Sequence, residues 1–394
     1  MAEKVNIIGA GAAGVFLAVL LSQKGIASTV YDANVAAGRK FLVAGGGGLN
    51  ITHSEPAESF IHKYTPAAFL KPAFDRYSNL TFMQWLEDLG FSLYTGSSGR
   101  VFPSKNDKPI ALLNRLIQKA EAGGATFSFQ HKLTQVAANG CILETPTGLK
   151  EIKGPIVYAL GGASWRVTGS TGEWLSLFQS AGCETEDFAA SNCQFLVDWP
   201  SSFLQAHEGK PLKNTRFSCG TYHTLGEAVI TRNGIEGSGV YPLSPAIRHQ
   251  LLSGKATLLL DLLPLVTSDE LVQRLSRGEG PLSKRILSTT SLSRTQLALV
   301  KAFTSKEVFQ HPTQVAQRIK QLPIIITSTG TIDDAISTTG GLALSEIDET
   351  FRLIRFNQAH AIGEMLAYDA PTGGYLLQSC FTMAATVAQQ FYAT

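Results

Sequence analysis

"VNIIGAGAAGVFLAVLLSQKG", residues 5–25, is the stretch that decides the fold. Residues 5–8 form a short apolar run typical of a buried strand, and the second half of the stretch has the apolar pattern of a helix. Between them, Gly9, Gly11 and Gly14 have the spacing G-x-G-x-x-G, which permits a tight turn, close approach of a pyrophosphate and close helix-to-strand packing. The stretch therefore predicts a strand-turn-helix unit that binds a dinucleotide at the helix N-terminus.

A second predicted strand, residues 28–31, ends in Asp32, 18 residues past Gly14. A carboxylate at this point accepts hydrogen bonds from both ribose hydroxyls of an adenosine and repels a 2′-phosphate. The pattern thus favours FAD or NAD over NADP. The alternative is a turn with chance glycines before a surface aspartate.

The composition is that of a globular protein large enough for two or three domains. The 394 residues are 44% hydrophobic and carry a formal charge of +2, so we expect no nucleic-acid partner on charge alone. No apolar run approaches the ~20 residues of a membrane span, and the N-terminus lacks the features of a signal peptide. We therefore expect a cytoplasmic protein that binds no membrane.

The cysteines and histidines give no sign of a metal site or a redox pair. The five cysteines are scattered without a C-x-x-C pair, and the histidines lack H-x-x-x-H spacing. We expect buried free thiols and no metal. The sequence also lacks a G-x-S-x-G nucleophile elbow and a phosphate loop of the NTPase type.

Glycine-rich segments recur far from the first fingerprint. "IVYALGGASW", 156–165, predicts a buried strand that runs into Gly161-Gly162. Further on, Gly363-Glu364 is followed by Gly373-Gly374 at the start of an expected final helix. An NAD dehydrogenase needs only the first unit, whereas a flavoprotein also holds a ribityl chain and a flavin ring with distant segments, so these segments favour FAD.

On these motifs the chain resembles the HI0933-like family of FAD-dependent oxidoreductases along nearly its whole length. The matching motifs are G-x-G-x-x-G at 9–14, G-R-K at 38–40 with glycines 45–47 and Asn50, G-R-V-F-P at 99–103, G-G-A-S at 161–164, T-G-S-T-G at 168–172, T-x-G-G at 338–341, G-E at 363–364 and T-G-G-Y at 372–375. The resemblance implies a Rossmann-like α/β fold, a two-dinucleotide-binding-domain flavoprotein with an inserted β-rich domain and a small helical subdomain.

The resemblance also implies where the FAD lies. The run Gly45-Gly46-Gly47-Gly48 would pass beside the ribityl chain and flavin ring, where a Cβ would obstruct a planar ligand, although a flexible surface loop is the alternative. The complete set of expected cofactor-binding residues is Gly9, Gly11, Ala12, Ala13, Gly14, Asp32, Ala33, Arg39, Lys40, Gly45, Gly46, Gly47, Asn50, Val136, Gly161, Gly162, Gly363, Glu364, Gly373, Gly374, Tyr375 and Leu376.

Three positions depart from the family pattern. Relatives usually carry Arg-Cys where this chain has Gly48-Leu49, an Asn where it has Leu376, and a glutamate where it has Asp32. Because these positions lie at the expected flavin or substrate site, the motifs alone do not identify the substrate of this chain.

The expected domain organisation follows from a change in the sequence pattern near residue 191, where short strand-like and helix-like stretches begin. We expect a first part of the FAD-binding domain at 1–190, an inserted β-rich substrate domain at 191–331 with a helical subdomain at about 265–320, and a second part of the FAD-binding domain at 332–394. Stretches 215–234 and 256–264 predict β-hairpins, and 268–278 and 291–303 predict helices.

Candidate catalytic residues are Arg100, His53 and Tyr375. Arg100 could bind an acidic substrate or a flavin oxygen, His53 could act as an acid or base near neutral pH, and Tyr375 could cover the ring. We expect hydride transfer between FAD and a small organic substrate, with NAD(P)H considered as a transient electron donor; the family is described as containing reductases and amine oxidases. Two alternatives stay open, a flavin-binding protein with a sensing or interaction role and an NAD-dependent dehydrogenase.

Overall fold

The computed structural model describes residues 4–44, 48–104, 108–277 and 279–392. It separates into two compact units: unit 1 is Met1–Ala190 with Ile336–Thr394, and unit 2 is Ser191–Ala335. The sequence-based boundaries lay at 190/191 and 331/332.

Unit 1 is built on a five-stranded parallel sheet with the strand order β20-β10-β1-β2-β6. Its strands are β1 (Val5–Ile8), β2 (Ser28–Asp32), β6 (Ala125–Phe129), β10 (Ile156–Tyr158) and β20 (Ala359–Ala361). In register, Ile7 of β1 lies opposite Val30 and Val157. Strands of this kind are apolar on both faces because helices or loops cover both sides. The Rossmann-like α/β class is confirmed.

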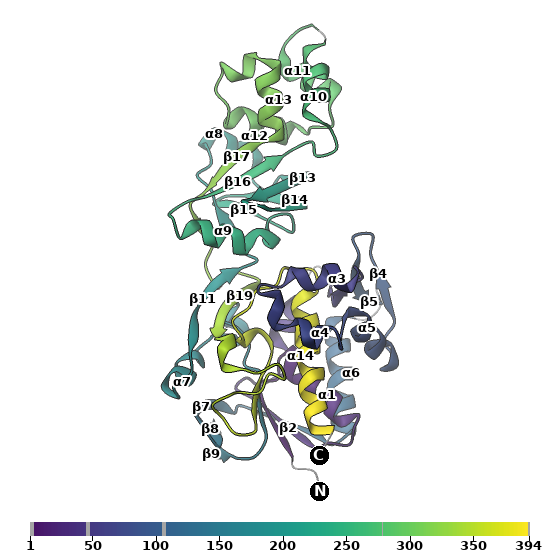
Figure 1. Ribbon diagram of the computed structural model, residues 1–394, viewed down its shortest axis with the longest axis vertical. Helices are drawn as coiled ribbons and strands as arrows, with labels where there is room; N and C mark the ends of the chain where they lie inside the picture. The colour runs from purple at the N-terminus through teal and green to yellow at the C-terminus, as the bar shows by residue number, and fades with distance from the viewer. Residues whose placement is uncertain (1–3, 45–47, 105–107, 278, 393–394) are drawn as a thin grey trace. The chain divides into compact units, whose positions relative to one another are not determined.

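Helix α1 (Ala12–Ser22) is the centre of the unit 1 core. Its residues from Ala13 onward are all buried, and an all-round apolar helix is stable only where other elements enclose it. It packs against α6 (Pro109–Ala122) and against α14 (Tyr375–Tyr392), so the purple first helix and the yellow last helix lie side by side (Figure 1). The two ends of the chain therefore complete one domain.

Smaller elements surround this core. The remaining helices of unit 1 are α2 (Arg39–Ala44), α3 (Ala57–Phe60), α4 (Lys71–Phe74), α5 (Asn79–Asp88) and α7 (Leu175–Ser180). The small sheets are β3-β5-β4, with β3 (Thr52–His53), β4 (Leu93–Thr95) and β5 (Arg100–Pro103); β7-β8-β9, with β7 (Lys132–Ala137), β8 (Gly140–Thr145) and β9 (Gly148–Ile152); and β11-β19, with β11 (Thr185–Ser191) and β19 (Ser337–Leu342).

Unit 2 contains an antiparallel seven-stranded sheet with the order β17-β16-β13-β14-β15-β12-β18. Its strands are β12 (Phe195–Leu196), β13 (Pro211–Cys219), β14 (Tyr222–Thr231), β15 (Gly234–Glu236), β16 (Ala256–Asp261), β17 (Leu322–Ile326) and β18 (Ser328–Thr329). The hairpin predicted at 215–234 is present as β13 and β14. The hairpin predicted at 256–264 is wrong, because this stretch is the single strand β16, which pairs with β13 and β17.

Helices complete unit 2 as α8 (Ser201–His207), α9 (Ser244–Leu251), α10 (Ser268–Ser276), α11 (Leu282–Thr289), α12 (Arg294–Ala302) and α13 (Pro312–Lys320). Helices α10 and α12 lie where the sequence predicted them, and each begins at a side-chain N-cap, Thr267 and Ser293. All five cysteines are buried and free, as predicted. Among the described residues, no helix has both the length and the apolar character needed to span a bilayer.

Candidate functional site

The glycines of the first turn hold β1 and α1 close together. A Cβ on Gly9 would lie 2.2 Å from the Ala159 carbonyl oxygen, and a Cβ on Gly14 would lie 2.0 Å from the Gly9 carbonyl oxygen, so neither position has room for a side chain. Gly11 differs, because nothing lies within 4 Å of the position of its Cβ. Gly11 is the N-cap of α1 and brings no side-chain oxygen to the helix N-terminus, which suits that end of the helix to a phosphate.

Asp32 holds the same turn from the end of β2. Its Oδ2 accepts a hydrogen bond from the Ala10 N–H at 2.7 Å, and its Oδ1 accepts hydrogen bonds from the Asn34 backbone N–H and side-chain amide at 2.8 and 2.9 Å. Asn34 Oδ1 in turn accepts from Arg39, which also donates to the carbonyl oxygen of Val167 at 2.8 Å. Each carboxylate oxygen has two lone pairs, so Asp32 can fix the loop and still accept from a ligand.

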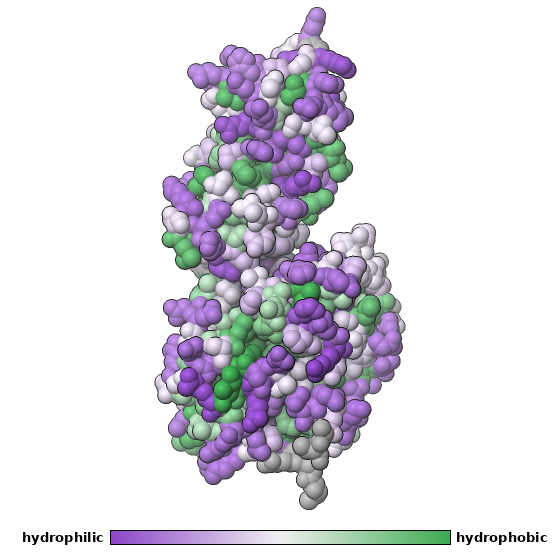
Figure 2. All heavy atoms as spheres, viewed as in Figure 1, coloured by the Kyte–Doolittle hydropathy of each residue, from purple (hydrophilic) through white to green (hydrophobic). Residues whose placement is uncertain are grey.

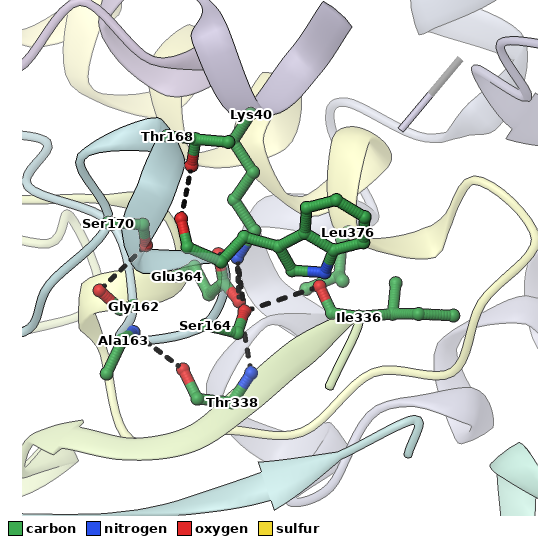
Figure 3. Close-up of polar contacts among 12 residues, drawn as sticks. Lys40, Gly162, Ala163, Ser164, Thr168, Ser170, Ile336, Thr338, Glu364 and Leu376 are labelled. Carbon is green, nitrogen blue, oxygen red and sulfur yellow. Dashed lines mark hydrogen bonds and ion pairs between the residues drawn. The ribbon is translucent and has the colours of Figure 1, made fainter. Parts of the chain in front are cut away.

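Lys40 and Glu364, 324 residues apart, form an ion pair (Figure 3). The Lys40 Nζ lies 2.8 Å from Glu364 Oε2 and donates to Ser164 Oγ at 2.7 Å. Glu364 Oε1 also accepts from the Thr338 N–H at 3.1 Å, and Thr338 Oγ1 accepts from the Ala163 N–H. These contacts join α2, the glycine-rich segment after β10 and the C-terminal part of the chain, where the sequence placed separate cofactor motifs.

Gly162 is needed at this junction. A Cβ there would lie 2.2 Å from Thr338 Oγ1 and 3.0 Å from the Glu364 carboxyl carbon. Its backbone carbonyl accepts a hydrogen bond from Ser170 Oγ at 2.9 Å, which ties in the Thr-Gly-Ser-Thr-Gly segment.

A cavity of about 610 Å³ runs along the carboxyl ends of the parallel strands between these groups. Twelve of the predicted cofactor-binding residues line it: Gly9, Gly11, Ala12, Ala13, Asp32, Ala33, Arg39, Lys40, Gly161, Gly363, Glu364 and Leu376. The cavity thus joins the fingerprint and the C-terminal motifs in one site. Open sheets of this type bind ligands at the carboxyl ends of their strands.

Other predicted cofactor residues lie elsewhere. Gly14, Asn50, Val136, Gly162, Gly373, Gly374 and Tyr375 are not among the residues that line the cavity, and Gly45, Gly46 and Gly47 lie outside the described residues. Val136 is buried in β7, and its neighbours Leu133 and Thr134 line the cavity instead. Asn50 donates to the carbonyl oxygens of Thr52 and Val101, while its buried Oδ1 has no donor among the described residues.

The sequence did not single out several lining residues. Five such lining residues are not part of a glycine motif themselves: Phe41, His131, Leu133, Ile336 and Cys380. Thr168, Gly169 and Ser170 also line it, and the motif at 168–172 was the available signal for them.

The residues fit an adenine dinucleotide with a flavin. A carboxylate lies at the end of β2, Gly11 leaves open space at the N-terminus of α1, and the cavity lining as a whole is largely apolar. Asp32 would hold the ribose, the N-terminus of α1 the pyrophosphate, and Lys40 with Glu364 the ribityl side.

The three predicted catalytic residues form a second cluster outside the cavity lining. His53 on β3 lies opposite Arg100 on β5, and its ring stacks on that of Tyr375 with centroids 5.9 Å apart. The Tyr375 hydroxyl donates to Glu55, a residue that the sequence motifs did not indicate. Burial and this hydrogen bond raise the pKa of Tyr375 above its usual value.

His53 is held by the backbone on both sides of its ring. Its Nδ1 accepts from the Glu55 N–H at 3.1 Å, and its Nε2 lies 2.9 Å from the Ser98 carbonyl oxygen, to which it donates in the neutral tautomer. Both ring nitrogens therefore take part in hydrogen bonds that hold His53 within the β3-β5 region, and its role as an acid or base stays a prediction.

Glycine is required beside this cluster. Gly374 has φ +93°, and a Cβ on it would lie 2.5 Å from the Thr52 backbone nitrogen, so β3 runs directly against the start of α14. The Nε atom of Arg100 lies 3.8 Å from the position of a Cβ on Gly373. The Gly-Gly pair therefore brings Arg100, His53 and Tyr375 together.

Fold and cavity together define a Rossmann-type dinucleotide-binding domain with an antiparallel domain inserted in its sequence. The model of the HI0933-like protein Rossmann domain matches residues 3–390. The chain belongs to the HI0933-like family, as its motifs predicted.

Two curated relatives are each named ribosomal RNA dihydrouridine synthase. The protein from Haemophilus influenzae is 26% identical over 407 residues, which cover 98% of both chains. The protein from Escherichia coli is 30% identical over 131 residues, covering 33% of this chain and 32% of the relative.

Solved structures share the fold. The 3-ketosteroid Δ4-(5α)-dehydrogenase of Rhodococcus jostii RHA1 matches with a TM-score of 0.52 and 14% identity, covering 99% of this chain and 97% of that one. The 3-ketosteroid Δ1-dehydrogenase of Sterolibacterium denitrificans matches with a TM-score of 0.53 and 11% identity, covering 99% of both chains. At these identities the likeness concerns the fold alone.

Proposed function

We propose that the protein reduces a uridine base of ribosomal RNA to dihydrouridine by hydride transfer from reduced FAD, with NAD(P)H as the electron donor. The observation that carries the flavin part is the cavity that joins the fingerprint at Gly11 and Asp32 to Lys40 and Glu364. The substrate part is supported by the Haemophilus influenzae relative, whose similarity extends over 98% of both chains.

Saturation of the uracil C5=C6 bond requires a hydride at one carbon and a proton at the other. Reduced FAD supplies the hydride, so the chain must bind the base, orient it and deliver the proton. Tyr375 is the candidate proton donor, because burial and the hydrogen bond to Glu55 keep its hydroxyl protonated at neutral pH. The neighbouring Arg100 guanidinium, half-buried on β5, suits a carbonyl oxygen of the base.

Glu55 would return the proton to Tyr375. Its carboxylate accepts the Tyr375 hydroxyl and lies 4.0 Å from the Lys63 Nζ, so the pair borders a partly exposed cation. In this scheme Tyr375 would give its proton to carbon as the hydride arrives, and the Glu55 carboxylate would then take a proton from solvent and pass it to the phenolate.

A small free substrate is the second candidate function. The resemblance to a family of reductases and amine oxidases favours it, and the same cavity and cluster would serve it. In that case the flavin exchanges a hydride with a small organic molecule, and the RNA is not a reactant.

The test begins with an absorbance spectrum of the purified protein from 300 to 600 nm and anaerobic addition of NADH and then NADPH. We expect flavin bands that bleach. Transcribed ribosomal RNA added to the reduced protein should restore the bands, and nuclease digestion followed by mass spectrometry should find dihydrouridine.

The Gly11→Val variant is the control, since a side chain there would fill the space for the pyrophosphate. Reoxidation by oxygen or small carbonyl and amine compounds, with no dihydrouridine in the RNA, would refute the RNA substrate and leave the second candidate.

A further inference from the structure

We infer that the helical module, defined as residues 265–320 with helices α10 to α13, binds the phosphate backbone of ribosomal RNA. The inference rests on the proposed function, which makes ribosomal RNA the substrate. Its starting point is the distribution of charge: the module has nine Lys and Arg against four Asp and Glu, whereas the rest of the chain has 24 against 27. The near-neutral total therefore conceals one basic segment.

Three of the nine cations have structural roles. Arg274 pairs with Glu270 at 2.6 Å, Lys320 pairs with Asp261 at 2.8 Å, and Arg285 donates to the Leu275 carbonyl oxygen. The other six form no ion pair with a residue that the structure describes, and all but the last are exposed: Arg277, Lys284, Arg294, Lys301, Lys306 and Arg318. On the face drawn in Figure 2, mainly hydrophilic side chains cover these helices.

Helix α12 shows how the module separates its core from its charges. Leu297 and Val300 are buried, while Arg294 and Lys301 are exposed. A spacing of seven residues is about two helical turns, so the two cations share one face about 10 Å apart along the axis. Two exposed cations on one face can contact phosphates of the same strand.

RNA explains this arrangement better than a small substrate does. The flavin site acts on one base, whereas most of the affinity of a protein for a polynucleotide comes from Lys and Arg contacts with phosphates away from that base. An insertion that concentrates cations supplies such phosphate contacts.

The test compares two double charge reversals in the full-length holoprotein. Arg294→Glu with Lys301→Glu changes the module, and Lys4→Glu with Lys119→Glu makes the same charge change at exposed positions of unit 1. Filter binding of transcribed ribosomal RNA at 50 to 300 mM salt gives the dissociation constant and its salt slope. Vesicles containing phosphatidylserine serve as the competing anionic surface.

We expect the module variant to bind RNA at least tenfold more weakly at 150 mM salt, with a salt slope smaller by about 1.4–1.8, since each phosphate contact contributes about 0.7–0.9. NADPH-driven bleaching of the flavin should be unchanged, and the KM for RNA should rise. The unit 1 variant should bind like the parent protein.

If the parent protein forms dihydrouridine but both variants bind RNA with equal affinity, the role of the module is overturned and the proposed function stands. Binding of vesicles in place of RNA would also overturn it. If the parent protein neither binds nor modifies RNA, the proposed substrate fails and the inference fails with it.

Discussion

Two glycines three residues apart should respond in opposite ways to the same substitution. At Gly14 an added Cβ would lie 2.0 Å from the Gly9 carbonyl oxygen and 3.3 Å from Ile7 Cγ2, so α1 would have to move away from β1. At Gly11 the Cβ meets nothing within 4 Å, and the backbone has φ −74° and ψ −172°, which any residue adopts. Gly14→Ala should therefore damage the fold, and Gly11→Ala should damage the cofactor site alone.

The magnitudes follow from these distances. Overpacking a core typically costs 1–3 kcal/mol, and a clash with backbone places Gly14→Ala at about 3 kcal/mol of unfolding free energy or more. Gly11→Ala should raise the stability of the FAD-free protein by about 0.4–1 kcal/mol, because alanine restricts the unfolded chain. Loss of close pyrophosphate contact should weaken FAD binding by about 1.5–3 kcal/mol, which raises the dissociation constant about 10- to 150-fold.

The assay uses protein stripped of FAD. Urea unfolding followed by tryptophan fluorescence gives stability, and quenching of flavin fluorescence gives FAD affinity. The argument fails if Gly11→Ala binds FAD as tightly as the parent protein, because the pyrophosphate then does not pass Gly11. It also fails if the two FAD-free variants unfold at the same urea concentration.

Further expectations concern the polar groups. Asp32→Ala should weaken FAD binding by about 1–3 kcal/mol and leave the Ala10 and Asn34 N–H groups without their acceptor; an unchanged flavin titration would exclude Asp32 as the ribose ligand. Removing one partner of the partly exposed Lys40–Glu364 pair should lower the free energy of unfolding by about 1–2 kcal/mol. A double-mutant cycle of urea unfolding with Lys40→Met and Glu364→Gln should show coupling, whereas additive losses would show that the two residues act independently. Burial lowers the pKa of His360 to about 4, so the folded state loses about 3 kcal/mol of stability as the pH falls from 6.5 toward 4. Urea unfolding from pH 7 to 4 should show a smaller loss of stability in His360→Leu than in the parent protein. Equal pH profiles of the two proteins would contradict the assignment.

Local patterns were enough to predict the first domain. The strand, glycine turn and helix at the start lie within 25 residues, and their periodicity and turn chemistry are set by neighbours in sequence. The same holds for α10 and α12, which begin at Thr and Ser caps. Residues 125–145 show both sides of this. Their alternating pattern predicts strand pairs, and β7 and β8 do pair with each other, but β6 pairs in parallel with β2, far earlier in the chain.

Side-chain partnerships in the site were harder to predict for the same reason. The motifs indicated Lys40 and Glu364 individually, but the ion pair spans 324 residues and exists only once the C-terminal segment has returned to the sheet. The sequence likewise suggested His53 as an acid or base, whereas the backbone N–H of Glu55, two residues away, and the distant carbonyl oxygen of Ser98 occupy both ring nitrogens. The type of a residue determines which chemistry its side chain can perform. The fold determines whether the functional atoms of that side chain are already engaged in hydrogen bonds.

Charge shows a related effect of averaging over the chain. The total charge of +2 led to the expectation of no polyanionic partner. A total over 394 residues, however, cannot reveal an excess of Lys and Arg that is held in one insertion. The module at 265–320 lies between two paired strands of the unit 2 sheet: the chain leaves the sheet after β16 and returns at β17, which pairs with β16 itself. The helices have their own core, which includes Leu271, Ile286 and Ile319. Lys and Arg can therefore occupy the surface of these helices without changing the sheet that contains β16 and β17. Charge should be counted over such topological units, because each unit meets a partner with its own surface and its own field.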